Sequence, residues 1–538
     1  MNFKNYLKKS GITQKVLNLK SLSCKEIIVK IISLLLGILL SVVTFNRLIY
    51  SLYNINYRYP TEYRDGAVID IANQFTNHIN PYTVLNSLPH TYVYGFVFPF
   101  LDSIIERLAS FDLVEIHHFI TLICVILICS LVSVEVFKKT KSINLTLISS
   151  AIVLSYNVVT LRPEPLAIAL TVLSLFIVNN DRLVDYKRVL LLSLIAIVLF
   201  YVKPYFVILF GVLMIYFVFN QSKKNLLQLF ISFTFLFMVS ALIIAAIFPM
   251  YFPSTVMNNL NMYNTHQISW MVKQTADFSR LNWLIVSAFI LTAVVGFVRR
   301  LRLSANLNRF DKPLLSMTQT PLENIYFIYA LVSIIVLTFM MGQHTGSYME
   351  YYIQLLVIPI LIFSITYGYD IAKKFRCKDV ICVVFIVLFL FQYRNFLNVI
   401  KIDHSSDNQA WAQAIDYINN HDPSNAYLSP PFTAESILWG WPIYDNGQTY
   451  AFEASAIFDP RYNFLKPLFP YSQYVPARLD QWDKEIDQKL LTKQFSVIAL
   501  SSEDEGLING QYLRKNYVVK QEMDLPINLG HIEFWQPK

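Results

Sequence analysis

Apolar runs separated by short polar segments fill the chain from residue 27 to about residue 398. A helix needs about 20 apolar residues to cross the hydrocarbon core of a bilayer. The pattern predicts about eleven membrane spans, near residues 27–48, 116–137, 143–160, 165–180, 188–201, 205–220, 226–250, 282–298, 324–341, 352–369 and 379–397. The helices that meet at "LRPEP" (161–165) and at Lys203-Pro204 are short for a span. We therefore expect both turns to lie in a recess of the outer leaflet.

The basic residues support this division and give it a direction. With the N-terminus in the cytoplasm, every basic cluster falls on the cytoplasmic side, which membrane proteins prefer. The clusters are "KKTKS" (138–142), "NNDRLVDYKR" (179–188), "QSKKN" (221–225), "RRLRLSANLNRFDK" (299–312) and "AKKFRCK" (372–378). One span more or fewer would move every later cluster to the opposite side, so the agreement favours a multi-pass protein in this orientation.

The first outer loop, residues 49–115, holds two segments with helical periodicity. Apolar residues from Asp65 to Ile79 repeat on one face, which predicts a helix lying on the membrane with Asp70 on the opposite, solvated face. The segment 92–108 is also apolar, but three charged residues near its end favour an interfacial helix over a span.

Beyond residue 399 the chain becomes more polar and loses its long apolar runs. Apolar positions at helical spacing predict a helix over 408–420, with an inward face formed by Trp411, Ala414, Ile415 and Ile418. A helix over 483–493 precedes a buried strand at 495–502, and "NYVVKQEM" and "GHIEFWQP" are typical of two further strands. About 140 residues suffice for an independent α/β domain.

The expected fold class is thus an α-helical polytopic membrane protein with a small C-terminal α/β extracytoplasmic domain. We divide the chain into a cytoplasmic N-terminal segment (1–26), a transmembrane domain (27–398) and a periplasmic α/β domain (399–538).

Composition agrees with this class. Hydrophobic residues make up 55% of the 538 residues and charged residues only 15%, with a mean hydropathy of +0.44. A soluble protein would carry about a quarter charged residues. The net charge of +8 is explained by the cytoplasmic clusters, so nucleic-acid binding is not indicated. The five cysteines lie in apolar runs or basic loops and suggest neither a disulfide framework nor a metal site.

Four charged residues stand where charge is costly, in or beside apolar helices. Charged groups at membrane depth cost about 2.5–3.5 kcal/mol each on insertion scales and often mark a site. Arg162 and Glu164 lie at the turn between two apolar helices, and Lys203 interrupts an apolar stretch. Asp65 begins the helix of the first outer loop. Structural explanations stay open: Asp65 and Glu164 suit helix starts, and the two cations suit the headgroup region.

Together these residues suit the transfer of a sugar from a polyprenyl-phosphate carrier. Arg162 and Lys203 can neutralise a phosphate, and the polar turn with His344 in "GQHTGSYMEYY" (342–352) can present backbone N–H groups to it. The carrier phosphate is a good leaving group that needs charge stabilisation. The acceptor needs a base, and a carboxylate in partly desolvated surroundings can serve.

The chain resembles the GT-C superfamily of integral-membrane glycosyltransferases, in particular its bacterial protein-mannosyltransferase and aminoarabinose-transferase-like members. The resemblance rests on "YRDGAVIDIANQFTNHINPY" after the first span, "RPEP" in the next outer loop and "GSYMEYY" before a later span. It covers most of residues 27–400. It implies that Asp65 is the first-loop catalytic carboxylate and Glu164 the second acid, with Arg162 and Lys203 at phosphate-contacting positions. Glu164 departs from the more frequent Asp, and a "WWDYG" oligosaccharyltransferase signature is missing.

The expected function is therefore an inverting glycosyltransferase of the bacterial cytoplasmic (inner) membrane, which takes sugar from a polyprenyl-phosphate donor. The acceptor would be lipopolysaccharide, another surface polysaccharide or a lipid-linked glycan. We expect Arg64, Tyr82 and Tyr348 to contribute to acceptor or sugar binding. The sequence implies no certain cofactor and leaves open whether a divalent metal takes part.

Two alternatives remain. An O-antigen-type polymerase would be expected to carry an arginine-rich outer loop, whereas the loop at 251–280 has one arginine. A lipid-linked glycan transporter or flippase would be expected to show internal repeats, and we find no convincing repeat.

Overall fold

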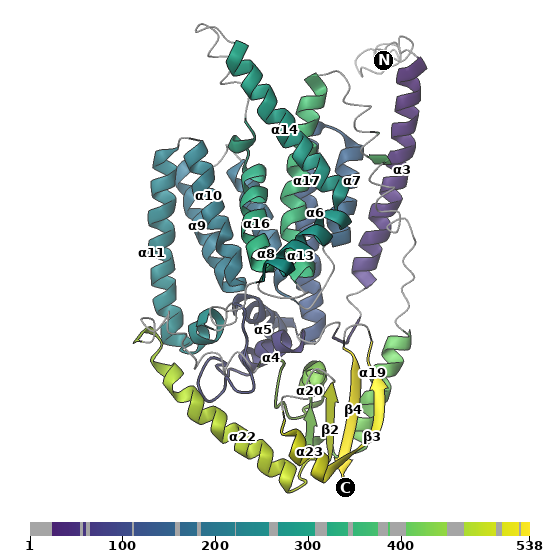
Figure 1. Cartoon of the computed structure of the whole chain (residues 1–538), viewed down its shortest axis with the longest axis vertical. Coiled ribbons are helices and arrows are strands. Elements are labelled where there is room, and N and C mark those ends of the chain that lie inside the picture. Colours follow the sequence, from purple (N-terminus) through teal and green to yellow (C-terminus); the bar gives the residue numbers. More distant parts are fainter. Residues whose placement is uncertain are drawn as a thin grey trace, which may run out of the picture.

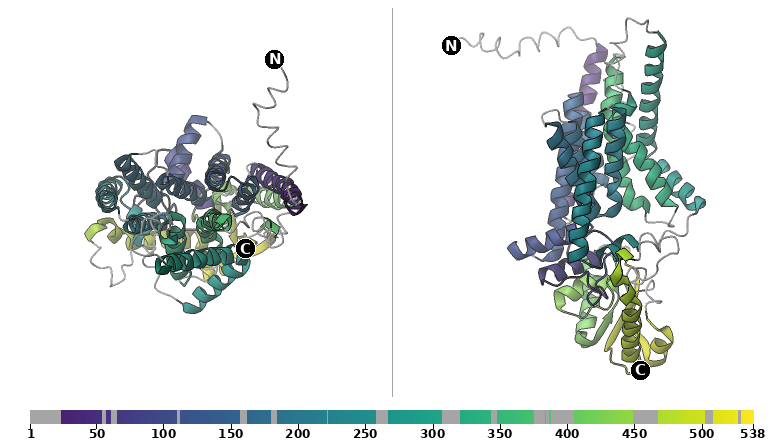
Figure 2. Two further views of the ribbon diagram at one scale, coloured as in Figure 1. Left: turned by 90° about the horizontal axis from the view of Figure 1, so that it is seen from above. Right: turned by 90° about the vertical axis from the view of Figure 1, so that its left-hand side faces the viewer.

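The computed structural model describes residues 24–53, 57–60, 65–109, 112–156, 162–179, 184–220, 222–257, 267–306, 320–342, 348–374, 383, 386–387, 405–448, 467–501, 508–526 and 529–538. The molecule is elongated, with a bundle of helices at one end and a small α/β unit at the other (Figures 1 and 2). Between them lies a layer of two short helices, α4 (Asp65–Thr76) and α5 (Val97–Ala109).

The bundle is built from apolar helices joined by short turns. Its elements are α3 (Cys24–Tyr53), α6 (Leu113–Thr140), α7 (Ile143–Tyr156), α8 (Glu164–Val178), α9 (Asp185–Val202), η2 (Pro204–Val207), α10 (Ile208–Phe219), α11 (Lys223–Ile247), η3 (Pro253–Met257), α13 (Ile268–Leu281), α14 (Trp283–Asn306), η5 (Pro321–Glu323), α16 (Ile325–Met341) and α17 (Tyr348–Lys374). The predicted turn at Lys203-Pro204 is confirmed: α9 ends at Val202, and α9 and α10 lie side by side (Figure 1).

Five helices in the described part of the chain are long and apolar enough to cross a membrane, so the chain is a membrane protein by length and composition. These helices are α3, α6, α11, α14 and α17, and four shorter apolar helices accompany them. The total of about eleven spans stays a prediction. The span expected at 379–397 falls almost entirely outside the described residues.

The helices of the bundle differ in how many of their apolar side chains are buried, and this difference separates central helices from helices at the edge. In the most apolar window of α17, 72% of residues are buried, whereas in α11 only 6% are. Helix α17 therefore packs inside the bundle, and α11 exposes most of its apolar side chains at the edge. In a bilayer such an exposed apolar surface is covered by lipid.

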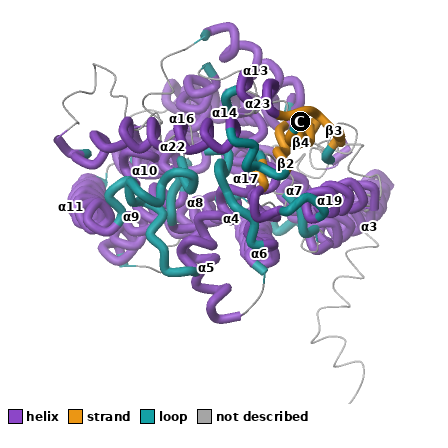
Figure 3. Tube along the Cα trace, turned by 90° about the horizontal axis from the view of Figure 1, so that it is seen from below, coloured by secondary structure: helices purple, strands orange, loops and turns teal. Residues whose placement is uncertain are grey.

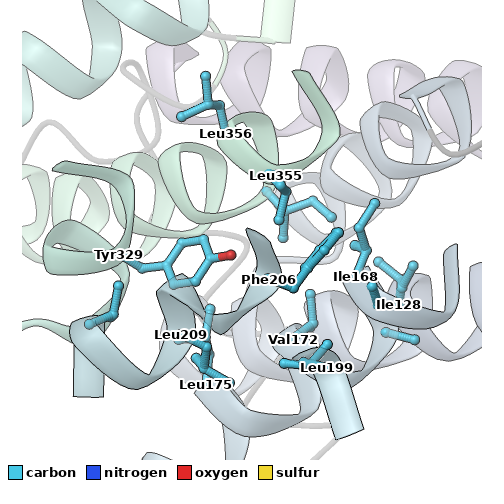
Figure 4. Close-up of a cluster of buried hydrophobic side chains, with 14 of the residues drawn as sticks. Ile128, Ile168, Val172, Leu175, Leu199, Phe206, Leu209, Tyr329, Leu355 and Leu356 are labelled. Atoms are coloured by element: carbon cyan, nitrogen blue, oxygen red, sulfur yellow. The ribbon is translucent and has the colours of Figure 1, made fainter. Parts of the chain in front are cut away.

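An apolar core fills the centre of the bundle next to the Lys203 turn. Side chains from α6, α8, α9, η2, α10, α16 and α17 interdigitate there (Figure 4). Phe206 is fully buried in this core, only three residues after Lys203. Because aromatic burial resists displacement, Phe206 fixes the position of the turn.

Helices α4 and α5 lie across the end of the bundle, beside the α/β unit (Figures 1 and 3). The helix expected over 65–79 ends at Thr76, and α5 begins only at Val97, with 13 residues, too few for a span. The expectation that α4 keeps one solvated face is wrong. Nearly all of its residues are buried, because α20 (Thr433–Trp439) and η8 (Pro430–Phe432) cover its polar side.

The C-terminal segment forms an α/β unit around a four-stranded sheet. Strand β1 (Ala426–Leu428) pairs in parallel with β2 (Val497–Ser501), and β4 (His531–Pro537) lies antiparallel between β2 and β3 (Tyr517–Asp524). The predicted strands at 495–502, 516–523 and 530–537 are all confirmed. Its described helices include α19 (Ser405–Asn419), α22 (Val475–Leu491) and α23 (Gly510–Asn516), with short turns η7 (Pro423–Asn425) and η10 (Pro470–Tyr474).

The α19 helix shows the predicted inward face. Trp411, Ala414, Ile415 and Ile418 are buried against the sheet residues Val497 and Phe534. By contrast, the helix expected over 483–493 is longer, since α22 begins at Val475. Val475 belongs to the hydrophobic core of the bundle, so α22 ties the α/β unit to the helices above it.

Candidate active site

Four residues singled out by their charge converge at the end of the bundle that faces the α/β unit. Asp65 begins α4, Arg162 and Glu164 lie at the start of α8, and Lys203 lies between α9 and η2. All four are buried, with 1% of Asp65, 8% of Arg162, 4% of Glu164 and 3% of Lys203 exposed. The structure therefore brings together charges that the sequence places in separate loops.

The contacts within this cluster differ in strength. Lys203 Nζ forms an ion pair and donates a hydrogen bond to Glu164 Oε1. The Arg162 guanidinium lies between the acids, with Nε 3.7 Å from Asp65 Oδ1 and Nη1 4.0 Å from Glu164 Oε1. Those distances exceed hydrogen-bond range, so Arg162 acts on both carboxylates through charge. Two cations thus balance two carboxylates in a buried site.

Local sequence explains why these side chains are held in place. Pro163 and Pro165 flank Glu164, and proline suits the first turn of a helix because its missing N–H is not needed there. Lys203 is extended, with φ −160° and ψ 117°, as a residue before proline prefers. Both turns are therefore stiff, and the charged side chains project from stiff backbone.

Three further residues complete the cluster and were not anticipated. The Tyr94 ring lies under the ammonium of Lys203, 3.9 Å from its centroid, and the Tyr205 ring is 5.3 Å away. Gly95 N donates to Val202 O at 3.1 Å. A Cβ at Gly95 would lie 1.7 Å from the carbonyl oxygen of Tyr201, so only glycine permits this approach. In the sequence, only the glycine between Tyr94 and Phe96 could have pointed to this close contact.

Asp70 differs most from expectation. It is fully buried rather than solvated, and its carboxylate accepts hydrogen bonds from His90 Nδ1 at 2.8 Å and Asn446 Nδ2 at 2.9 Å. Burial lowers the pKa of His90, but the charge and hydrogen bond of Asp70 raise it by more, so the pKa lies above its ordinary value. Asn446, which belongs to the α/β unit, is 376 residues away in sequence. Helical periodicity could not reveal this partner and therefore assigned Asp70 to a solvated face.

The expected sugar-binding and phosphate-binding residues have mixed outcomes. Arg64 and His344 lie outside the described residues, as does the side chain of Tyr348. Tyr82 is buried in an aromatic cluster with Phe248 and Tyr251, at ring-centroid distances of 5.5 and 5.4 Å. Its hydroxyl has no hydrogen-bond partner within the described part of the chain. Their roles therefore stay predictions.

Tyr92 also carries a buried hydroxyl without a hydrogen-bond partner among the described residues. Burial first, and then the neighbouring Tyr82, Tyr94 and Glu164, hold the pKa of Tyr92 well above its ordinary value. The group therefore stays a phenol that can donate a hydrogen bond and cannot serve as a base. Sequence gave no reason to select it, because tyrosine is abundant in this chain, with 33 residues.

Among the described residues, no group of metal ligands forms at this cluster. Each carboxylate there faces a cation, and a divalent ion would have to displace both. Within the described ranges one group could hold a metal, formed by Glu522, His531 and Glu533 on the β3–β4 ribbon. In this group the Glu522 side chain is exposed and the side chains of His531 and Glu533 are partly exposed.

A second buried acid lies where the α/β unit meets α4. Glu435 on α20 is fully buried, and Trp439 Nε1 donates to its Oε2 at 3.1 Å. Burial raises the pKa of Glu435 to about 7, against the lowering effect of Arg58, while Asp112 adds to the rise. This carboxyl therefore changes its charge near neutral pH.

Comparison with known proteins gives a distant similarity of overall fold. No family model and no curated protein matches the chain in sequence. A structure of the Archaeoglobus fulgidus oligosaccharyltransferase in the apo form aligns with 88% of this chain and 70% of that chain, at 12% identity and a TM-score of 0.47. A structure of the same protein in complex with Zn and sulfate aligns with 92% of this chain and 72% of that chain, at 12% identity and a TM-score of 0.48.

Proposed function

We propose that the protein is a membrane glycosyltransferase that moves a sugar from a polyprenyl-phosphate-linked donor to a glycan or glycolipid acceptor. The observation that carries this proposal is the buried cluster of Asp65, Arg162, Glu164 and Lys203. Four buried charges are expensive to maintain as a purely structural device, since apolar residues of similar volume are often as stable or more stable. A site that binds an anion needs the two cations, and a site that removes a proton needs a carboxylate, so one catalytic task explains both kinds of charge.

The two cations are the proposed binding group for the donor phosphate. The bond between the sugar C1 and the phosphate oxygen breaks with its electron pair, and the extra negative charge collects on the phosphate. Arg162 is well placed to contact it, because its guanidinium already interacts with two anions and offers a planar fork of donors. Lys203, held over Tyr94, adds a second positive charge.

Asp65 is the proposed base. It would take the proton from the acceptor hydroxyl or amine while the oxygen or nitrogen attacks C1 opposite the phosphate, which inverts the configuration at that carbon. A phosphate that draws Arg162 away from Asp65 would also increase the basicity of the carboxylate. Donor binding would therefore activate the base, and Glu164 would orient Lys203 and the acceptor.

Other parts of the proposal concern surroundings rather than chemistry. The unpartnered hydroxyls of Tyr82 and Tyr92 offer hydrogen bonds to sugar or acceptor groups. The bilayer supplies the donor from the side, and the cluster would face the outside of a bacterial inner membrane with the N-terminus in the cytoplasm. The sugar, the acceptor and the carrier length are to be found by experiment.

Sugar transfer by purified protein in nanodiscs tests this function. Native lipid extract supplies donor and acceptor, and mass spectrometry follows a sugar-sized gain on the acceptor. We expect wild-type transfer to fall at least about 100-fold in Asp65→Asn, as is usual for loss of a general base. Asp416→Asn, a matched change at an exposed position of α19, should keep wild-type activity.

Three results would contradict the proposal in different ways. Equal transfer by wild type and Asp65→Asn would remove Asp65 from the chemistry. Growth of a glycan by whole repeat units would show a polymerase. Movement of the lipid-linked sugar across the membrane without any new covalent product would show a transporter.

A further inference from the structure

A short turn of the α/β unit, Asp445–Gln448, is inserted into the first outer loop. Asn446 Nδ2 donates to Asp70 Oδ2 at 2.9 Å and to the backbone oxygen of Thr91 at 2.9 Å. Gln448 Oε1 accepts from the backbone N of Val93 at 2.7 Å. Asn446 and Gln448 are fully buried, so water cannot replace these contacts.

The turn is held in shape before it makes those contacts. Asp445 Oδ1 accepts from Gly447 N at 2.8 Å, and Asn446 Oδ1 accepts from Gln448 N at 3.1 Å. Gly447 has φ 86°, a conformation that glycine adopts without strain. Side-chain-to-backbone bonds of this kind are typical of tight turns. The two amide side chains therefore present fixed hydrogen-bonding groups to the outer loop.

These bonds reach both halves of the proposed active site. Asp70 lies in the same short helix as Asp65, the proposed base. Val93 immediately precedes Tyr94, whose ring supports Lys203, and Gly95, which is bonded to Val202. One rigid turn thus contacts the helix that carries the base and the segment that holds the cation.

Stability alone does not favour such a contact. Burying polar amides costs free energy unless every group is bonded, and each unsatisfied buried group costs about 1–3 kcal/mol. Gln448 Nε2 has no hydrogen-bond partner within the described part of the chain. An apolar side chain would pack at lower cost, whereas directional bonds set distances that packing alone does not fix.

We propose that Asn446 and Gln448 are positioning residues that set the separation between Asp65 and the Arg162–Lys203 cations. The α/β unit thereby becomes part of the transferase site. This inference rests on the proposed function for its catalytic consequence, while the structural part stands by itself. A displacement of about 1 Å at a reacting group can cost roughly 100-fold in rate, so a small relaxation of α4 suffices.

The test compares Asn446→Ala and Gln448→Leu with Asn419→Ala, an exposed asparagine on α19 that makes no side-chain hydrogen bond among the described residues. Hydrogen exchange of residues 65–76 and 90–95 is measured beside kcat and KM for sugar transfer. We expect faster exchange in both segments and a kcat at least about tenfold lower, with KM changed less than about twofold. The control should match wild type in every readout.

A swap strengthens the test. Asn446→Asp alone places a second carboxylate against Asp70 and should be the most damaging change. In the double variant Asn446→Asp/Asp70→Asn, the new amide at position 70 can donate to the new carboxylate at position 446. Protection against hydrogen exchange and kcat should therefore partly recover. A protein that had merely lost its fold would not recover in this way.

The inference is overturned if Asn446→Ala exchanges like wild type in both segments, or if its turnover is unchanged. A rise in KM alone would instead make the turn an acceptor-binding element and would also overturn it. If wild type transfers no sugar, the proposed function fails, and hydrogen exchange still decides whether the turn holds α4 in place.

Discussion

At the scale of single residues, the site consists of charges made tolerable by specific neighbours. Lys203 contacts the carboxylate of Glu164 and the face of Tyr94, and Arg162 lies between Glu164 and Asp65. Removing one member of a buried pair leaves the other uncompensated, which costs more than removing both. The stability of the site therefore depends on pairs rather than on single groups.

Lys203→Met alone should lower the free energy of unfolding by about 3–5 kcal/mol, because Glu164 would stay buried with only the more distant Arg162 to balance its charge. The double variant Lys203→Met/Glu164→Gln should lose clearly less. Thermal unfolding in detergent measures both, with Glu164→Gln alone completing the cycle. Strictly additive losses would show that the pair contributes nothing to stability.

Gly95→Ala should destabilise the protein by about 1–3 kcal/mol and abolish most transfer, because its Cβ would collide with the backbone of Tyr201 and displace Tyr94 from Lys203. Gly211→Ala is a matched control, since no atom lies within 4 Å of a Cβ there and the position is helical. The control should keep activity and gain slightly in melting temperature. An active Gly95→Ala variant would contradict the packing argument.

The four charges of the site could be selected from sequence because charge is rare and costly inside apolar runs. Their partners could not be selected. Tyr94 and Tyr92 resemble many other tyrosines of the chain, and Asn446 resembles any asparagine in a turn. A contact across 376 residues leaves no local pattern, so Asp70 was assigned to solvent.

At the scale of elements, α4 shows how tertiary packing changes the meaning of an amphipathic pattern. Its apolar face, which the periodicity assigned to the membrane, packs on α5 and α6, and its polar face is covered by α20 instead of water. Regular patterns elsewhere were reliable: α19 and the three longer strands follow from spacing alone. The three-residue strand β1 and the seven-residue helix α20 are too short for periodicity to reveal.

Gly66 marks the closest approach of α4 to α20, since a Cβ there would lie 2.6 Å from Thr433 Cβ. Gly66→Ala should separate the two helices and lower the melting temperature of the protein by a few degrees, or about 1–2 kcal/mol. Thr433→Gly removes the colliding atom. The double variant should therefore be more stable than the sum of the single effects predicts, and simple additivity would refute the contact.

At the scale of the whole molecule, the α/β unit is attached to the bundle by polar as well as apolar contacts. Val475 of α22 packs in the apolar core of the bundle, and α20 covers α4. Asn446 and Gln448 form hydrogen bonds with residues of the first outer loop. Glu435 is buried in this same contact, beside Arg58 and Asp112. The attachment should therefore respond to pH.

The pKa of Glu435 is raised from 4.5 to about 7, so the folded protein binds a proton that the unfolded chain releases. The stabilising contribution is complete below about pH 4.5 and is lost as pH rises through 7, by roughly 3 kcal/mol in all. The protection of α4 amides against hydrogen exchange, taken relative to their intrinsic rate at each pH, should therefore fall between about pH 4.5 and pH 7. Glu435→Gln should remove this pH dependence and slow exchange at pH 8. If Glu435→Gln keeps the pH profile of the wild type, the pH dependence comes from a group other than Glu435.

The bond between Asp70 and Asn446 has a consequence for biosynthesis. A ribosome adding about 5–20 residues per second needs roughly 20–75 s to make the 376 residues that separate the two partners. Throughout that interval the first outer loop has already been made, but the turn that holds it has not. The buried carboxylate of Asp70 therefore waits for its Asn446 partner until the α/β unit has been made. A chain released before residue 446 would leave Asp70, Thr91 and Val93 without the hydrogen-bond partners that this turn supplies.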